Sequence, residues 1–273
     1  MKKLNWNLIL GCTLLAVIVA MCLVSFFYLP FPPNVMDNLH AYLQPGADSA
    51  HLLGTDQYGR DILSRIMIGS RTVLLIAFVS VTCGAAAGFL LGASSAMIKG
   101  AYGAVVMRAI EGLIAFPGTL LALMLVAVVG KGQTGAILAI SIYTVAPFAR
   151  LVYTLILENK ALLAIKAARS FGVHSPRLLI HYYLPMLMPR LLTQFSASVA
   201  SAIMTEAALS FLGLGVQVPN ASWGLMLSEA KQYVLLYPYL AIAPGVAIFI
   251  TVLGFNLLSD GLNDLLIGRR SGK

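Results

Sequence analysis

The chain contains 273 residues, of which 59% are hydrophobic and only 10% are charged, and its formal net charge is +8. Soluble globular proteins carry about 25% charged residues. Together with a mean hydropathy of +0.89, this composition excludes a soluble globule and predicts that lipid surrounds much of the chain. Cys12, Cys22 and Cys83 lie in apolar stretches without paired spacing, so we expect free thiols.

Apolar stretches follow one another along the chain and predict an all-α polytopic membrane protein with six transmembrane helices. A helix needs roughly 20 apolar residues to cross the bilayer core. The first stretch follows Lys2 and Lys3, but its apolar run is longer than that of a secretion signal, so we interpret it as a retained anchor. The expected spans are residues 7–28, 72–97, 113–129, 136–153, 186–212 and 239–262.

These spans form a single transmembrane domain over residues 1–273. Residues 29–71 and 213–238 are expected to be outer loops, and residues 159–185 a cytoplasmic hairpin. The second outer loop is rich in Gly, Pro and Asn, which predicts a loop with a short helix.

The positions of Lys and Arg predict that both termini lie inside the cell. With the amino terminus inside, most cationic residues fall on the inner side, as in the positive-inside asymmetry of membrane proteins. The remaining cations, which fall outside, are Arg60, Arg65, Arg71, Lys131 and Lys231. This topology and anionic lipid headgroups explain the net positive charge without a nucleic-acid partner.

The sequence contains no pattern that predicts catalysis or a cofactor. It has no GxxxxGK[ST] phosphate-binding loop, so we expect that the chain does not hydrolyse ATP alone. No nucleophile has a nearby base. The histidines form no metal-binding pair with Cys, Asp or Glu at ligand spacing: His40, His51, His174 and His181.

Small residues recur every four positions on one face of the second expected span: Gly84, Gly88, Gly92 and Ala96. This spacing lets helix backbones approach closely in lipid. We expect the face to pack against another helix of the same subunit, with a subunit interface as the alternative.

A helix–turn–helix is predicted on the inner side, between the fourth and fifth spans. Residues 159–171 form the first helix, which Gly172 ends. Ser175 is expected to cap a second helix that begins with Pro176 and ends near Pro185. Connections between spans are usually shorter, so a docking role is favoured over a simple linker. The first helix carries an apolar stripe of Leu162, Leu163, Ile165 and Ala168.

This hairpin resembles the EAA motif of binding-protein-dependent ABC importer permeases. In that motif, EAA is followed by three residues, Gly, nine residues, a hydrophobic position, any residue, Leu and Pro. The spacing here fits in full, although Lys166 replaces the Glu and Tyr182 replaces the usual Ile. The resemblance implies that the hairpin docks into a separate ATPase subunit and passes its motion to the channel. The coupling residues would be Lys166, Ala167, Ala168, Gly172, Leu184 and Pro185.

Further motifs extend the resemblance to nearly the whole chain. Residues 51–65 resemble the GTDxxGRDxxSR segment of the dipeptide, oligopeptide and nickel permease family, and residues 210–215, 221–224 and 255–264 resemble the same family in order and spacing. The family implies a channel-forming subunit in the bacterial inner membrane that works by alternating access. Its implied partners are a second homologous permease, two ATPase subunits and an external solute-binding protein. A peptide-like cargo is favoured over a nickel or other metal chelate.

The outer-loop motif and the tryptophan that follows the fifth span each allow two interpretations. The motif is expected to form a self-capped turn with Asp and Arg paired, or else to contact cargo. Trp223 is an interfacial aromatic anchor or a contact for the binding protein. The motif residues are Gly54, Thr55, Asp56, Gly59, Arg60 and Asp61.

The end of the fifth span is a candidate gate. Glu206 lies within that span, where a carboxylate is costly and tends to face a cavity or a partner. It either lines the pathway or gate or makes a plain interhelical hydrogen bond. A competing class, a secondary transporter driven by an ion gradient, would use Glu206 as its proton or cation site. The other gate candidates, which are alternatively a flexible helix end, are Ser210, Phe211, Gly213 and Gly215.

Overall fold

The computed structural model describes residues 5–98 and 100–266, and their regular structure is entirely helical. Long apolar runs form the long helices, three of which contain an internal proline (Pro147, Pro189 and Pro244), and Pro and Gly also lie at most of the breaks between helices. The α-helices are α1 Trp6–Phe27, α2 Ile62–Met97, α3 Tyr102–Ile114, α4 Gly118–Val129, α5 Gln133–Asn159, α6 Leu163–Ser170, α7 Ser175–Leu178, α8 Leu184–Phe211, α9 Trp223–Ala230 and α10 Tyr239–Leu266.

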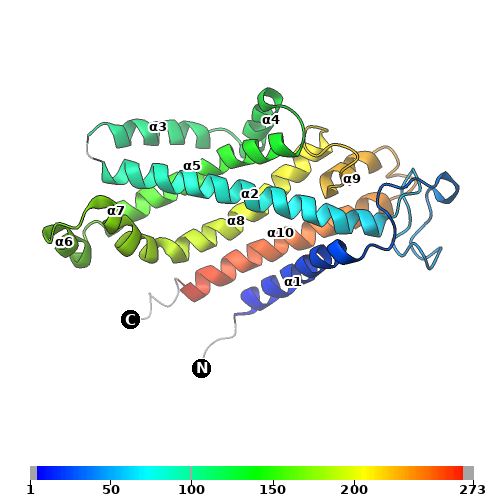
Figure 1. The fold of residues 1–273 in the computed structure, drawn as a ribbon, viewed down its shortest axis with the longest axis horizontal. Helices are drawn as coiled ribbons and strands as arrows, with labels where there is room; N and C mark the ends of the chain where they lie inside the picture. The colour runs from blue at the N-terminus through cyan, green and yellow to red at the C-terminus, as the bar shows by residue number, and fades with distance from the viewer. Residues whose placement is uncertain (1–4, 99, 267–273) are drawn as a thin grey trace.

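The long helices run side by side along one axis (Figure 1). Helices α1 and α8 run in one direction, and α2, α5 and α10 run in the other. Helices α6 and α7 lie at the end where α1 begins and α10 finishes, whereas the loop before α2 and helix α9 lie toward the opposite end. The hairpin and the outer loops are therefore separated by the length of the helical bundle.

Four of the described helices are long and apolar enough to cross a membrane: α1, α2, α5 and α10. A fifth is reached if α3 and α4 together form one bent span. The expected fifth span coincides with α8, which has 28 residues but also contains Arg190, Gln194 and Glu206. By length and apolarity alone, the structure therefore does not reach the expected count of six.

The expected span at 113–129 is wrong as a single helix. Helix α3 ends at Ile114, α4 begins at Gly118, and the two meet at an angle of 97°. Pro117 lies in the break, where its missing N–H removes no helical hydrogen bond. Helix α2 also begins at Ile62 rather than at residue 72, because Asp61 caps it: the Asp61 side chain accepts a hydrogen bond from the Ser64 N–H.

The small residues of α2 pack against α5 within the same subunit. A methyl group built on Gly84 would lie 2.6 Å from Cβ of Thr144, and one built on Gly88 would lie 2.6 Å from the carbonyl oxygen of Val145. Any side chain at these positions would push the two backbones apart. The interpretation as packing within the subunit was therefore correct.

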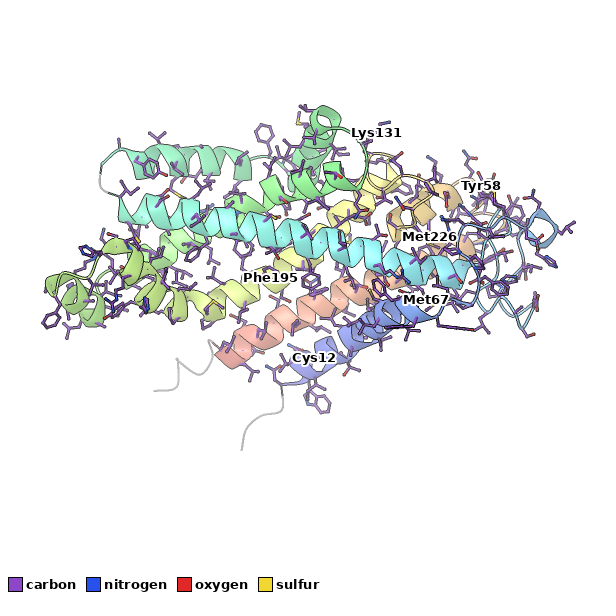
Figure 2. All side chains as sticks on the ribbon, viewed as in Figure 1. Cys12, Tyr58, Met67, Lys131, Phe195 and Met226 are labelled. Carbon is purple, nitrogen blue, oxygen red and sulfur yellow. The ribbon has the colours of Figure 1, made fainter. Side chains whose placement is uncertain are left out.

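Aromatic rings connect three of the long helices in the middle of the bundle. The ring centroid of Phe195 in α8, labelled in Figure 2, lies 6.2 Å from that of Phe78 in α2. The ring centroid of Phe78 in turn lies 5.8 Å from that of Phe255 in α10. Helix α1 is attached at the edge, where Asn5 donates a hydrogen bond of 2.9 Å to the carbonyl oxygen of Gly261. The remaining surface of α1 exposes large apolar side chains, including Val17 and Phe26, as expected for contact with lipid.

Candidate functional site

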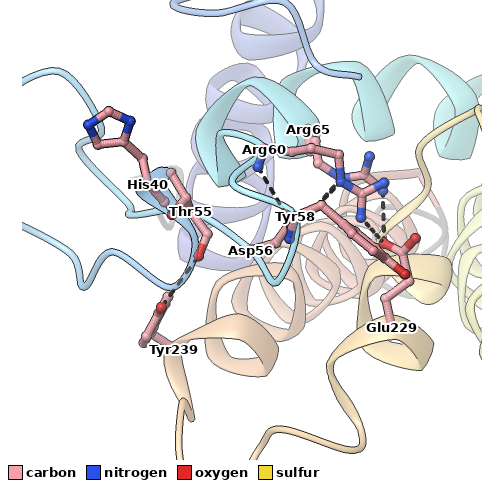
Figure 3. A network of polar contacts seen from close by, with 8 residues as sticks. All are labelled: His40, Thr55, Asp56, Tyr58, Arg60, Arg65, Glu229 and Tyr239. Atoms are coloured by element: carbon pink, nitrogen blue, oxygen red, sulfur yellow. Dashed lines mark hydrogen bonds and ion pairs between the residues drawn. The ribbon is translucent and has the colours of Figure 1, made fainter. Parts of the chain in front are cut away.

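The outer loop folds around Asp56 (Figure 3). One carboxylate oxygen of Asp56 accepts hydrogen bonds from the backbone N–H of Tyr58 at 2.9 Å and of Arg60 at 3.0 Å. The other oxygen lies 2.6 Å from Nε of Arg60. This is the geometry of the self-capped turn, with Asp56 and Arg60 paired.

Glu229 of α9 joins this turn to the beginning of α2. One of its carboxylate oxygens lies 2.9 Å from the guanidinium of Arg60 and 2.9 Å from that of Arg65. Asp56, Arg60 and Arg65 are buried, and Glu229 is mostly buried. Two arginines and two carboxylates thus balance their charges inside the protein, where removing one partner would leave an uncompensated charge. Sequence analysis did not identify Glu229 as a site residue, because a pairing across 164 residues has no local signal.

The other motif residues fix the shape of the loop. Gly54 and Gly59 have positive φ angles of +77° and +73°, which side chains other than glycine rarely adopt. Thr55 donates a hydrogen bond to the carbonyl of His40, and its hydroxyl oxygen accepts one from the Leu43 N–H at 2.9 Å. Asp61 caps α2 and also lies 3.0 Å from the imidazole of His51, outside the Asp56 network.

Tyrosines make a second connection between the outer loop and α10. The ring of Tyr42 stacks on Tyr237 with 4.3 Å between centroids and meets the edge of Tyr233 at 5.6 Å. The hydroxyl of Tyr239, the first residue of α10, donates a hydrogen bond of 3.3 Å to the carbonyl of Thr55 (Figure 3). Burial raises the pKa of the Tyr42 hydroxyl, and the neighbouring Tyr233 adds to this shift.

Trp223 lies in the interior rather than at an interface. Its side chain is fully buried, and its indole N–H donates a hydrogen bond of 3.1 Å to the carbonyl of Ile66 in α2. Gly69 leaves room for the ring, since a methyl group there would lie 2.9 Å from the indole. Both expected roles, interfacial anchor and binding-protein contact, need an accessible ring, so the structure corrects them: Trp223 fastens α9 to α2.

Glu206 is fully buried near the end of α8. One carboxylate oxygen accepts a hydrogen bond of 2.7 Å from Ser210, whose hydroxyl in turn accepts one of 2.9 Å from the Val216 N–H. The other carboxylate oxygen has no partner among the described residues. Glu206 therefore helps to hold the loop after α8 and lines none of the cavities described below.

The segment from Ser210 to Gly215 is a well-defined helix end. Gly213 has a φ angle of +75°, and the N–H groups of Leu214 and Gly215 both donate to the carbonyl of Leu209, at 2.9 and 3.0 Å. Of the proposed gate residues, Phe211 exposes its side chain, whereas Ser210 is buried.

In the hairpin, α6 divides its apolar residues between two sides. Ile165 and Ala168 are buried in a cluster with Leu178 and with residues of α2 and α5. Leu163 and Phe171 are 83% and 87% exposed. The expected single stripe is therefore split, because Ile165 and Ala168 hold the hairpin to the bundle while Leu163 and Phe171 project from it. Lys166 and Ala167 are also exposed.

The ends of the hairpin helices differ from the prediction. Helix α5 continues to Asn159, so the first hairpin helix starts only at Leu163. Gly172 ends it as expected, with a φ angle of +75°. Ser175 is already inside α7 and makes no capping hydrogen bond.

The second hairpin helix does not stop at Pro185. Helix α7 continues through a π-helical turn at Leu179–Tyr183 directly into α8. Leu184 and Pro185 begin α8 directly after the π-helical turn, and the Leu184 N–H still donates to the carbonyl of Leu179 in that turn. The hairpin and the long helix α8 are therefore connected without a loop.

Three adjoining cavities open on one side of the bundle. The largest, of about 690 Å³, lies between the α3–α4 bend and α5 and includes Tyr143, Arg150 and Thr154. The second, of about 320 Å³, shares Tyr143 with the first and is lined by α4, α5, α8 and α10. The third, of about 430 Å³, shares Leu151 with the first and is lined by α5, α8 and α10.

Polar side chains of α4, α8 and α10 line the second and third cavities. They include hydroxyl, amide and guanidinium groups, and such groups within membrane segments typically face a water-filled pathway or a partner. Sequence analysis found none of them, because they are spaced along their helices and separated by apolar residues. A polar face spread out in this way is hard to recognise in the sequence. These side chains are Thr119, Arg190, Thr193, Gln194, Ser201, Thr205, Asn256, Ser259 and Asn263.

A bundle of apolar helices with a polar-lined side and a helical hairpin at one end is the architecture expected of a membrane transport permease, and comparison with known proteins shows the family. The family model for the binding-protein-dependent transport system inner membrane component matches residues 84–272. The chain belongs to this family. It is the multi-pass inner-membrane permease subunit of an ABC importer, in which a separate subunit supplies the ATPase.

Individual relatives cover most of the chain. The glutathione transport system permease protein GsiD of Pectobacterium atrosepticum is 41% identical over 245 residues, which is 89% of this chain and 81% of that protein. The GsiD protein of Escherichia coli O6:K15:H31 is 38% identical over 253 residues, covering 91% and 83% of the two chains. Among solved structures, an inward-facing MetNI methionine ABC transporter contains a chain with a TM-score of 0.59 at 18% identity, matched over 75% of this chain and 95% of that chain. That last similarity establishes the fold alone.

Proposed function

We propose that this subunit forms one half of a pathway for small peptides, and that the hairpin transmits ATPase motion to that pathway through α8. The observation that carries the proposal is the unbroken connection of α7 to α8. Helix α8 starts at the hairpin and also presents Arg190, Gln194 and Ser201 to the cavities. A movement of the hairpin would therefore move a wall of the pathway directly.

The exposed side of the hairpin is suited to docking on an ATPase subunit. Leu163, Phe171 and Ile180 project large apolar side chains from the inner end of the bundle. Exposed apolar side chains gathered in this way are typical of protein–protein contacts. Docking through them needs no carboxylate, so Lys166 in place of the family's Glu is compatible with this function.

The complete importer would contain a second homologous permease, two ATPase subunits and an external solute-binding protein. The open side of the three cavities supports the second permease, because polar walls within a membrane need a facing partner or water. The binding protein would meet the outer loop and the segment around α9. ATP-driven rocking of the two permeases would then open the pathway alternately to either side.

A peptide-like cargo fits this subunit better than a metal chelate. The relatives reported above carry glutathione, a small peptide, in their names. They give no support to the expected nickel or metal-chelate alternative. Glutathione itself is therefore the first cargo to test.

Uptake measurements separate this function from an ion-gradient transporter. In cells that express the importer with its partners, we expect uptake to survive an uncoupler and to stop when ATP is depleted. We also expect Glu206→Gln to transport within about twofold of wild type, because the amide oxygen can still accept the Ser210 hydrogen bond. Gradient-driven uptake without ATP, abolished by Glu206→Gln, would contradict the proposal and favour the secondary transporter.

A further inference from the structure

We propose that Arg150, assisted by Arg190, makes the inner half of the pathway selective for anionic solutes. This inference rests on the proposed pathway and adds the charge of the cargo to it. Arg150 lines the largest cavity and Arg190 the adjoining one, and Leu151 belongs to both. The described residues that line the three cavities include these two arginines and no Asp or Glu, whereas a smaller cavity of about 160 Å³, which shares Arg190 with the third, is lined by Glu158.

Arg150 has the stronger influence because its charge is not balanced nearby. It forms no ion pair with any residue in the described ranges, and its side chain is exposed. Arg190 lies 3.5 Å from Glu158, so part of its charge is compensated. Leu113, Phe116 and Pro147 line the same cavity as Arg150, and most of its other lining residues are apolar as well. In such surroundings a charge acts over a longer distance than in bulk water.

The positive-inside asymmetry alone does not account for this placement. Arg108 and Arg177, which satisfy that asymmetry equally well, line none of the three cavities. Arg150 lies on α5 nine residues before its end at Asn159, on the same helical face as Thr154, a second cavity-lining residue. A permeating solute with carboxylate groups would meet the guanidinium before it leaves toward the inner side, whereas a cationic solute would be repelled.

Charged thiol reagents test the inference without knowledge of the cargo. Thr154→Cys would be introduced into a chain in which Cys12, Cys22 and Cys83 have been replaced, assembled with its partner subunits in inside-out vesicles. Residues four apart on a helix have Cβ atoms about 5–6 Å apart, so the thiol reports the potential beside Arg150. The rate at which the thiol reacts would be measured with the anionic sulfonatoethyl and the cationic trimethylammonioethyl methanethiosulfonate. Each rate would be divided by the rate with neutral methyl methanethiosulfonate, which corrects for accessibility.

We expect the corrected rate to be higher for the anionic reagent than for the cationic one. The ratio of the anionic to the cationic rate should fall by about threefold or more in Arg150→Gln. Arg150→Lys should retain the preference, and Arg108→Gln, a matched control at an exposed pair on α3, should leave it unchanged. An unchanged ratio in Arg150→Gln, or an equal fall in Arg108→Gln, would overturn the charge selectivity while leaving the pathway in place. A thiol that reacts with the neutral reagent only would overturn both, since the cavity would then be covered by lipid or protein.

Discussion

Glu229 is the residue through which α9 holds the two arginines of the outer loop network. Among the described residues, replacing it by Gln leaves Asp56 as the only carboxylate within ion-pair distance of Arg60 and Arg65, and all three are buried. Leaving one buried positive charge unpaired should lower the free energy of unfolding by about 3 kcal/mol. Thermal unfolding of the purified protein in detergent measures this loss.

Two further variants separate charge balance from a general effect of mutation in this region. Removing Arg65 together with Glu229 leaves a neutral pair of Asp56 and Arg60, so Arg65→Met with Glu229→Gln should be more stable than Glu229→Gln alone. Glu111→Gln breaks an exposed pair with Arg108 at 3.5 Å and should cost less than about 1 kcal/mol. Equal losses in Glu229→Gln and in the double variant would contradict a role in charge balance.

At the scale of single helices, the hairpin offers a direct test of coupling. Phe171 is 87% exposed at the end of α6, so Phe171→Asp places a charge on the proposed docking surface without disturbing the interior. We expect uptake to fall by about tenfold or more, with unchanged amounts of permease in the membrane, because an apolar contact cannot accommodate an unpaired carboxylate. Co-purification of the ATPase subunit with the permease should fall in parallel.

Leu39 supplies a matched control for this variant. It is 93% exposed in the outer loop, at the opposite end of the bundle, so Leu39→Asp should leave ATPase co-purification unchanged. Ala168→Asp is less suitable for the purpose, because Ala168 is buried against the bundle and a charge there would disrupt the hairpin itself. Normal uptake and co-purification in Phe171→Asp would exclude this face as the docking surface.

The elements also differ in how far the sequence determines them. The spacing of Gly84 and Gly88 was enough to predict a close helix contact, because only small residues allow it. The bend at Pro117 was missed because average hydropathy over 113–129 takes no account of chain direction, although proline followed by Gly118 is a break signal. Long-range pairs such as Arg65 with Glu229, and the cavity-lining side of α8, depend on how distant helices assemble and have no local pattern.

For the molecule as a whole, the bent pair α3–α4 connects two helices that run in the same direction. Helices α2 and α5 both end at the hairpin end of the bundle (Figure 1). Helices α3 and α4 therefore carry the chain back from the hairpin end before α5 begins, so the turn at Lys131 and the hairpin lie on opposite sides of the membrane. Two topologies are then possible: with the amino terminus inside, the hairpin is inside, and with the amino terminus outside, the hairpin is outside.

Single cysteines distinguish these two topologies in a chain that lacks Cys12, Cys22 and Cys83. Ser49, Asn220 and Lys131 are exposed near the outer end of the bundle, and Ser170 is exposed on the hairpin. We expect an impermeant thiol reagent to label Ser49→Cys, Asn220→Cys and Lys131→Cys in intact spheroplasts, because six crossings place all three outside. Ser170→Cys should react only after the membrane is opened, which also shows that its thiol is reactive. Labelling of Ser170→Cys from the outside, with Ser49→Cys, Asn220→Cys and Lys131→Cys protected, would mean that the orientation is inverted and that the hairpin cannot reach a cytoplasmic ATPase.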